Sequence, residues 1–136
     1  MNTNEKSGVL EGNKLDKIDV VVIEDDKSLA SMWASFATNK GKKVDVYHDR
    51  NEFLKNRHKY SKDTRIIVNY GLNKTPNGVE VAIILGKEGF SDFYMTTGCT
   101  EKQLARLEGH RIPSDLIVFD KAGDEDFEKM IKLLQE

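Results

Sequence analysis

The chain has 136 residues, enough for one domain with its own hydrophobic core. Its 23 acidic and 21 basic residues give a net charge of -2, so we expect no binding to nucleic acid and none to a membrane surface. Cys99 is the only cysteine, which excludes an intramolecular disulfide, and no apolar run is long enough to span a bilayer. These features predict a soluble, cytoplasmic protein.

Residues 1–16 are polar, contain glycine and show no helical or strand period, so we interpret them as a tail or the remnant of a linker. The folded domain is expected to cover residues 17–136. Within it, short apolar runs alternate with helical patterns. The predicted strands are 20–23, 44–47, 65–69, 93–96 and 116–119.

Helical patterns follow each of these strands, at 29–36, 49–54, 79–85, 101–107 and 124–134. The second begins with a capping-box pattern at Asp49 and Glu52. The third is almost entirely apolar, which indicates burial against a sheet. Strands that alternate with helices favour right-handed crossovers and helices on both faces. The sequence therefore predicts an α/β fold with a flavodoxin-like, doubly wound parallel sheet of five strands in the order 2-1-3-4-5.

Polar side chains stand at the C-terminal ends of the predicted strands. Glu24 and Asp25 follow the first strand, Asn69 ends the third, Thr97 follows the fourth and Lys121 follows the fifth. Strands one and three are neighbours in the expected order, so their polar ends should meet in one crevice. Carboxylates, a hydroxyl and a lysine suit metal-assisted phosphoryl transfer. The nucleophile position, however, holds an amide.

These segments resemble the receiver domain of two-component response regulators. Four motifs carry the resemblance in the family's order and spacing: Val-Val-Val-Ile-Glu24-Asp25-Asp26, Ile-Ile-Val-Asn69, Met-Thr-Thr97-Gly98 and Phe-Asp-Lys121. No motif is specific alone, but four in register make a strong signal. The resemblance covers residues 17–136.

The resemblance also implies a role for each residue of the crevice. Receivers hold Mg²⁺ with an acidic pair, the acceptor aspartate and a backbone carbonyl, while a threonine and a lysine contact the phosphoryl oxygens. By resemblance, the metal ligands would be Glu24, Asp25 and the carbonyl of Gly71, the phosphoryl contacts would be Thr97 and Lys121, and the acceptor position would be Asn69.

The sequence departs from the receiver pattern at three positions. Asn69 replaces the acceptor aspartate, Val118 stands where an aromatic switch residue is common, and Ala122 replaces the proline after the lysine. A neutral amide is a poor nucleophile and removes one anionic metal ligand, so we expect weak or absent Mg²⁺ binding. A cis peptide before alanine costs about 2.5–4 kcal/mol, so we expect a trans bond, with Lys121 displaced from the crevice.

Each of these residues also has a simpler interpretation. The acids after the first strand could only cap a helix, Asn69 could be a turn residue, Thr97 could end a strand, and Lys121 could be a solvated surface charge. Taken one at a time, these readings compete with a functional one. Taken in register, the residues favour a common site.

The leading functional hypothesis is a degenerate receiver, a non-enzymatic signalling module that contacts a histidine kinase or another signalling protein without aspartyl phosphorylation. The alternative is a phospho-accepting receiver of a two-component system whose acceptor aspartate is replaced by Asn69 in this chain. A flavodoxin-like flavin enzyme is a weaker third hypothesis, because the acids from Glu24 to Asp26 would repel a phosphate at the first strand end.

Overall fold

The computed structural model describes residues 17–136, so the expectation of a tail or linker at 1–16 lies outside the described residues. The described part forms a five-stranded, all-parallel sheet in the order β2-β1-β3-β4-β5, which confirms the predicted fold class. The strands are β1 (Val20–Ile23), β2 (Val44–Tyr47), β3 (Arg65–Asn69), β4 (Phe93–Thr97) and β5 (Ile117–Asp120).

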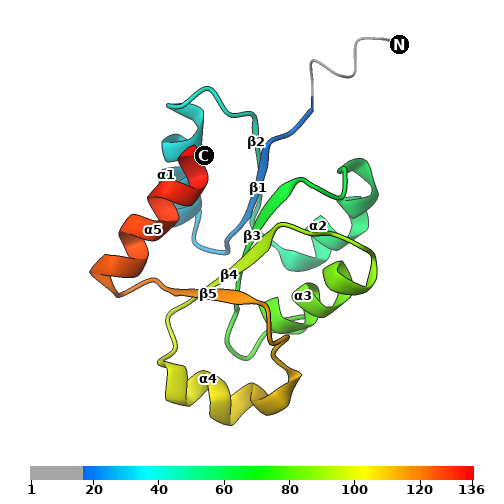
Figure 1. Ribbon diagram of the computed structural model, residues 1–136, viewed down its shortest axis with the longest axis vertical. Helices are drawn as coiled ribbons and strands as arrows, with labels where there is room; N and C mark the ends of the chain where they lie inside the picture. Colours follow the sequence, from blue (N-terminus) through cyan, green and yellow to red (C-terminus); the bar gives the residue numbers. More distant parts are fainter. Residues whose placement is uncertain (1–16) are drawn as a thin grey trace.

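Helices cover both faces of the sheet, with α1 and α5 on one face and α2, α3 and α4 on the other (Figure 1). Their bounds are α1 (Lys27–Thr38), α2 (Arg50–Asn56), α3 (Gly78–Lys87), α4 (Glu101–Glu108) and α5 (Asp124–Gln135). Short 3₁₀ turns follow α2 at Arg57–Lys59 and α4 at Gly109–Arg111. None of these helices is long and apolar enough to cross a membrane.

The two faces of the sheet are packed by alternate residues of the same strands. In β1, Val20 and Val22 join the cluster under α1 and α5, whereas Val21 and Ile23 join the cluster under α2, α3 and α4. All four side chains are buried, as expected for a strand in the interior of a parallel sheet. This double burial explains why the strand reads as a continuous apolar run.

Side-chain caps fix where the first four helices, α1 to α4, begin, and therefore where the loops before them end. Asp26 caps α1 by accepting from the amide of Leu29 at 3.0 Å. Asp49 caps α2 as predicted, but the expected capping box is wrong, because Glu52 pairs with Lys55 instead. Capping boxes are found at two other helices. Asn77 and Glu80 form one at the start of α3, and Thr100 and Gln103 form one at the start of α4.

Helix α3 begins in close contact with the end of β3. A Cβ at Gly78 would lie 2.9 Å from the carbonyl oxygen of Asn69, so only glycine allows this approach. The amide of Gly78 also donates to the carbonyl of Tyr70 at 2.6 Å. The segment between them, residues 70–77, is thereby held as a compact loop beside the crevice.

Candidate functional site

The parallel register brings the polar strand ends together as the sequence predicted. Ile23 pairs with Val68, which places Glu24 next to Asn69, and Thr97 pairs with Asp120, which places Lys121 beside them. The sheet continues past the strand ends, because the amide of Lys121 donates to the carbonyl of Thr97 at 2.9 Å. All of these residues therefore lie at the C-terminal ends of the strands, which is where doubly wound folds bind ligands.

Asn69, Gly71, Thr97 and Lys121 line a common cavity of about 410 Å³ that is open to solvent. Of these, Thr97 is almost fully buried, and its hydroxyl oxygen accepts from the backbone amide of Cys99 at 2.9 Å. The residues that resemblance assigned to phosphoryl binding thus share one cavity with the acceptor position.

Lys121 and Glu24 form the first of two ion pairs in the crevice. The Nζ of Lys121 lies 3.0 Å from Oε1 of Glu24, whose side chain is only 3% exposed. The second carboxylate oxygen of Glu24 accepts from the amide of Asp26 at 3.1 Å. The Lys121–Ala122 bond is trans, since the one cis peptide among residues 17–136 is Thr75–Pro76. The expected displacement of Lys121 is wrong, because its side chain reaches into the crevice.

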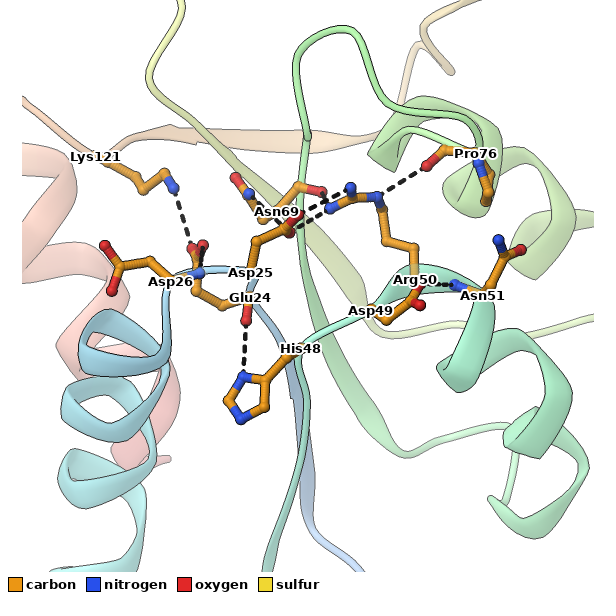
Figure 2. A network of polar contacts seen from close by, with 10 residues as sticks. All are labelled: Glu24, Asp25, Asp26, His48, Asp49, Arg50, Asn51, Asn69, Pro76 and Lys121. Atoms are coloured by element: carbon orange, nitrogen blue, oxygen red, sulfur yellow. Dashed lines mark hydrogen bonds and ion pairs between the residues drawn. The ribbon is translucent and has the colours of Figure 1, made fainter.

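Arg50 and Asp25 form the second pair, which the sequence did not predict. Figure 2 shows the guanidinium of Arg50 reaching from the start of α2 to the carboxylate of Asp25. Nη1 lies 2.6 Å from Oδ1 and Nη2 lies 3.2 Å from Oδ2. Nε donates to the carbonyl of Pro76 at 2.8 Å, and Nη1 lies 3.4 Å from the carbonyl of Asn69. The Arg50 side chain is 5% exposed and that of Asp25 is 35% exposed.

Burial has the largest single effect on the pKa of Asp25, and Arg50 is the main group that acts against it. Partial burial on its own would raise the pKa of Asp25, but the hydrogen bonds and positive charge of Arg50 outweigh it. The Asn69 amide and the charge of Lys74 act in the same direction as Arg50, so the pKa of Asp25 lies below its ordinary value. Asp25 is therefore a carboxylate at neutral pH and already has a cation of its own.

Asn69 points its amide towards Asp25. Its Nδ2 donates to Oδ1 of Asp25 at 3.4 Å, so the neutral side chain sits against a carboxylate without repulsion (Figure 2). A carboxylate at the same position would bring two like charges into proximity. A neutral amide at position 69 is therefore compatible with the nearby carboxylate of Asp25.

Gly71 provides the space that Arg50 occupies. A Cβ at Gly71 would lie 2.4 Å from Cζ of Arg50, and the φ angle of +71° also favours glycine. Its carbonyl, which resemblance assigned to a metal, accepts from the amide of Lys74 at 3.0 Å. The loop after β3 is therefore built around the guanidinium.

These arrangements do not fit a divalent metal. Each residue assigned to the metal already has a partner from the protein: Glu24 has Lys121, Asp25 has Arg50, and Gly71 has Lys74. The two carboxylates already face two cations, and these cations compete with Mg²⁺ for the carboxylate oxygens that it would bind. Between residues 17 and 136 no group of three or more His, Cys, Asp or Glu side chains could hold a metal ion.

A second polar network, also missed from the sequence, begins one residue after Asn69. The hydroxyl of Tyr70 donates to Glu108 at the end of α4, and Nδ2 of Asn77 donates to the same carboxylate oxygen at 3.1 Å. Burial, followed by the hydrogen bond to Glu108, raises the pKa of Tyr70, so the phenol stays protonated. This network ties the end of β3 to the first residues of α3 and to α4.

One signal in the sequence could have revealed Arg50. It occupies the first turn of α2, immediately after the cap Asp49, where the helix dipole disfavours a positive charge. An arginine in such a position needs a strong acceptor elsewhere. Its acceptor, Asp25, lies 25 residues away and comes within reach only when β2 packs beside β1.

Comparison with solved structures shows the fold of receiver domains. The response regulator receiver protein from Sinorhizobium medicae has a TM-score of 0.68 at 14% identity, covering 89% of this chain and 96% of that one. Vibrio cholerae chemotaxis protein CheY4 has a TM-score of 0.66 at 17% identity, covering 87% and 98%. The receiver domain of Francisella response regulator 1452 has a TM-score of 0.64 at 19% identity, covering 85% and 94%.

No protein-family model matches the sequence, and a search of curated proteins found no relative. At identities of 14–19%, the solved structures show the likeness of the fold and no more. The chain therefore has the three-dimensional architecture of a receiver domain.

Proposed function

We propose that this protein is a degenerate receiver, a non-enzymatic signalling module that works through contacts with other proteins and without aspartyl phosphorylation. The observation that carries the proposal is Asn69, which stands at the end of β3 in the same cavity as Thr97 and Lys121. The lining of this cavity includes a hydroxyl and a lysine, as a phosphoryl site would need, but no carboxylate nucleophile.

The chemistry of position 69 supports this proposal. A carboxylate attacks phosphorus because it is anionic, and it forms an acyl phosphate. The carboxamide of Asn69 is neutral, and its Nδ2 is already directed to Asp25. The same crevice offers no replacement nucleophile, since Glu24 and Asp25 are each bound to a cation.

The receiver fold supports a signalling partner of the kind that receivers contact, either a histidine kinase or another signalling protein. Because the proposed module has no phosphorylated state, its affinity for such a partner should not depend on a phosphodonor. The amount of complex formed would then depend on the concentrations of the protein and its partner, and not on phosphorylation.

A second candidate is a phospho-accepting receiver whose acceptor aspartate is replaced by Asn69. The position of Thr97 and Lys121 in the cavity beside residue 69 favours this candidate. Its consequence is that Asn69→Asp alone should create a phosphorylation site.

Intact-mass measurement after incubation with a small-molecule phosphodonor and Mg²⁺ tests whether the native chain lacks an acceptor, as both candidates require. We expect no mass change in the native protein. A gain of one phosphoryl group on the native chain would overturn the proposed function.

The variant Asn69→Asp separates the two candidates, and Asn73→Asp is its matched control, because it adds the same carboxylate in the exposed part of the neighbouring loop. The degenerate receiver predicts no phosphorylation of either variant. Phosphorylation of Asn69→Asp alone would support the second candidate instead.

A further inference from the structure

We infer that the guanidinium of Arg50 is the permanent cation of this crevice and takes the place of a divalent metal. The crevice would therefore reject Mg²⁺ even when a carboxylate is restored at position 69. This inference rests on the proposed function in one respect, since it concerns the same receiver-like site. It goes further by naming Arg50 as the residue that supplies a fixed positive charge to the site.

The position of the guanidinium is the first argument. It contacts the carboxylate of Asp25 and the backbone of Asn69, and it fills the space next to the Cα of Gly71. These are three of the four residues that the receiver resemblance places around a metal. In Figure 2 the guanidinium lies between Asp25, Asn69 and Pro76, so a metal that used both oxygens of Asp25 would have to displace Arg50 from them.

The fixation of Arg50 is the second argument. Its side chain is 5% exposed, and all three of its nitrogens donate: Nη1 and Nη2 to the carboxylate of Asp25, Nη1 also to the carbonyl of Asn69, and Nε to the carbonyl of Pro76. A planar guanidinium bound by two hydrogen bonds to a carboxylate is held in orientation as well as in position. The missing Cβ of Gly71 completes the fit on the remaining side.

The balance of charge is the third argument. Glu24 is paired with Lys121 and Asp25 with Arg50, so neither carboxylate has an unpaired negative charge with which to attract a divalent ion. Asn69→Asp would add only one negative charge, beside the oxygen of Asp25 that Nη1 of Arg50 already binds. A single uncompensated carboxylate is a weak site for Mg²⁺.

The consequence is a crevice that does not respond to divalent ions. A ligand that binds the folded state raises its stability, and one that does not bind leaves the stability unchanged. The midpoint of thermal unfolding with and without millimolar Mg²⁺ therefore reports on the crevice without any phosphodonor. Paramagnetic broadening of backbone amide signals by Mn²⁺ gives a second, local readout.

Four variants form the experiment: Asn69→Asp, Arg50→Met with Asn69→Asp, Arg50→Lys with Asn69→Asp, and Arg57→Met with Asn69→Asp. Methionine keeps much of the apolar stem of arginine but not its charge. Arg57 is the matched control because it also binds a carboxylate through two nitrogens, Glu88 at 2.8 Å, but outside the crevice.

Mg²⁺ should leave the unfolding midpoint of Asn69→Asp unchanged and raise that of the Arg50→Met double variant. Loss of hydrogen bonds to a charged group corresponds to a factor of about ten or more in an equilibrium constant, so Mg²⁺ affinity should rise by at least about tenfold. Mn²⁺ should broaden the amide signals of Asp25 and residue 69 in that variant. The Arg57→Met double variant should behave like Asn69→Asp.

Two results would overturn the inference. One is a Mg²⁺ response of Asn69→Asp as large as that of the Arg50→Met double variant, and the other is no response in either. If methionine at position 50 prevents folding, the Arg50→Lys double variant decides, because lysine keeps the charge but loses the two-point contact. It should then respond more strongly than Asn69→Asp, and equal responses would contradict the inference.

The outcomes also keep this inference apart from the proposed function. Phosphorylation of the native chain would overturn the proposed function, whereas a Mg²⁺ response of Asn69→Asp would overturn the inference. The Mg²⁺ titration contains no phosphodonor, so its result does not depend on whether the protein can be phosphorylated.

Discussion

Two ion pairs share the crevice, and they differ in geometry and in what surrounds their acidic partner. Lys121 makes a single contact with Glu24, a carboxylate that is 3% exposed, and both residues follow strands of the sheet. Arg50 makes two contacts with Asp25, which is 35% exposed, and it comes from a helix. Both residues of the first pair were assigned to the site by the receiver resemblance, whereas Arg50 of the second pair was not.

The difference teaches that the geometry of a pair and its contribution to stability are separate properties. The cost of removing one partner depends on the charge that is left behind. Glu24 would remain buried, whereas Asp25 would remain in contact with water. The pair with the poorer hydrogen-bond geometry should therefore be the costlier one to break.

The largest expected effect tests this ranking directly. Lys121→Met should lower the free energy of unfolding by about 3–5 kcal/mol, because it leaves a carboxylate buried without a cation. Arg50→Met should lower it by about 1–3 kcal/mol, because Asp25 keeps part of its hydration. Urea unfolding of both variants at neutral pH measures the two values.

Lys55→Met serves as the control for loss of a lysine charge. Lys55 is 72% exposed and lies 3.5 Å from Glu52, so its removal should change the free energy of unfolding by less than about 0.5 kcal/mol. If Arg50→Met lowers the free energy of unfolding more than Lys121→Met does, then the contact geometry of a pair, and not the charge left buried, determines its contribution to stability.

A smaller effect should appear in the pH dependence of the Arg50 pair. Because Arg50 lowers the pKa of Asp25, the ionised carboxylate adds stability that is fully present above the unfolded-state pKa, about 3.9. This stability is lost as pH falls through the lower, folded-state pKa. The difference between the native protein and Arg50→Met should therefore shrink as pH falls from neutral to below about 4.

Urea unfolding of both proteins across this pH range provides the measurement. The exposed Lys55→Met variant should keep a constant difference from the native protein over the same range. A gap between native and Arg50→Met that widens with acidity would mean that Asp25 does not supply the stabilising charge.

Most of the fold could be predicted because the local patterns agree with the global architecture. The interior strand β1 is buried on both faces and reads as an unbroken apolar run, and the acidic first turn of α5 marks its start. The fifth strand was shifted by one residue, since its pattern began at Leu116 while the strand begins at Ile117. Leu116 instead belongs to a turn, where its amide donates to the carbonyl of Pro113.

The site was only partly predictable, for a physical reason. Residues at strand ends converge whenever the strand order is right, so Glu24, Asn69 and Lys121 could be placed together from the sequence. Arg50 acts through a long side chain whose direction depends on the packing of α2 and on the loop at Gly71. No local pattern encodes that direction. The only sign of this role in the sequence was the position of Arg50 in the first turn of a helix, where the helix dipole disfavours a cation.

The central claim is that Arg50, and not a metal, supplies the positive charge at Asp25. A crystal structure of Asn69→Asp grown with Mn²⁺ tests it most directly, because the anomalous signal of the metal locates it independently of the protein. We predict no Mn²⁺ peak in the crevice and a guanidinium that still binds both oxygens of Asp25. A Mn²⁺ ion bound by Asp25 and the new carboxylate, with Arg50 displaced into solvent, would contradict the account.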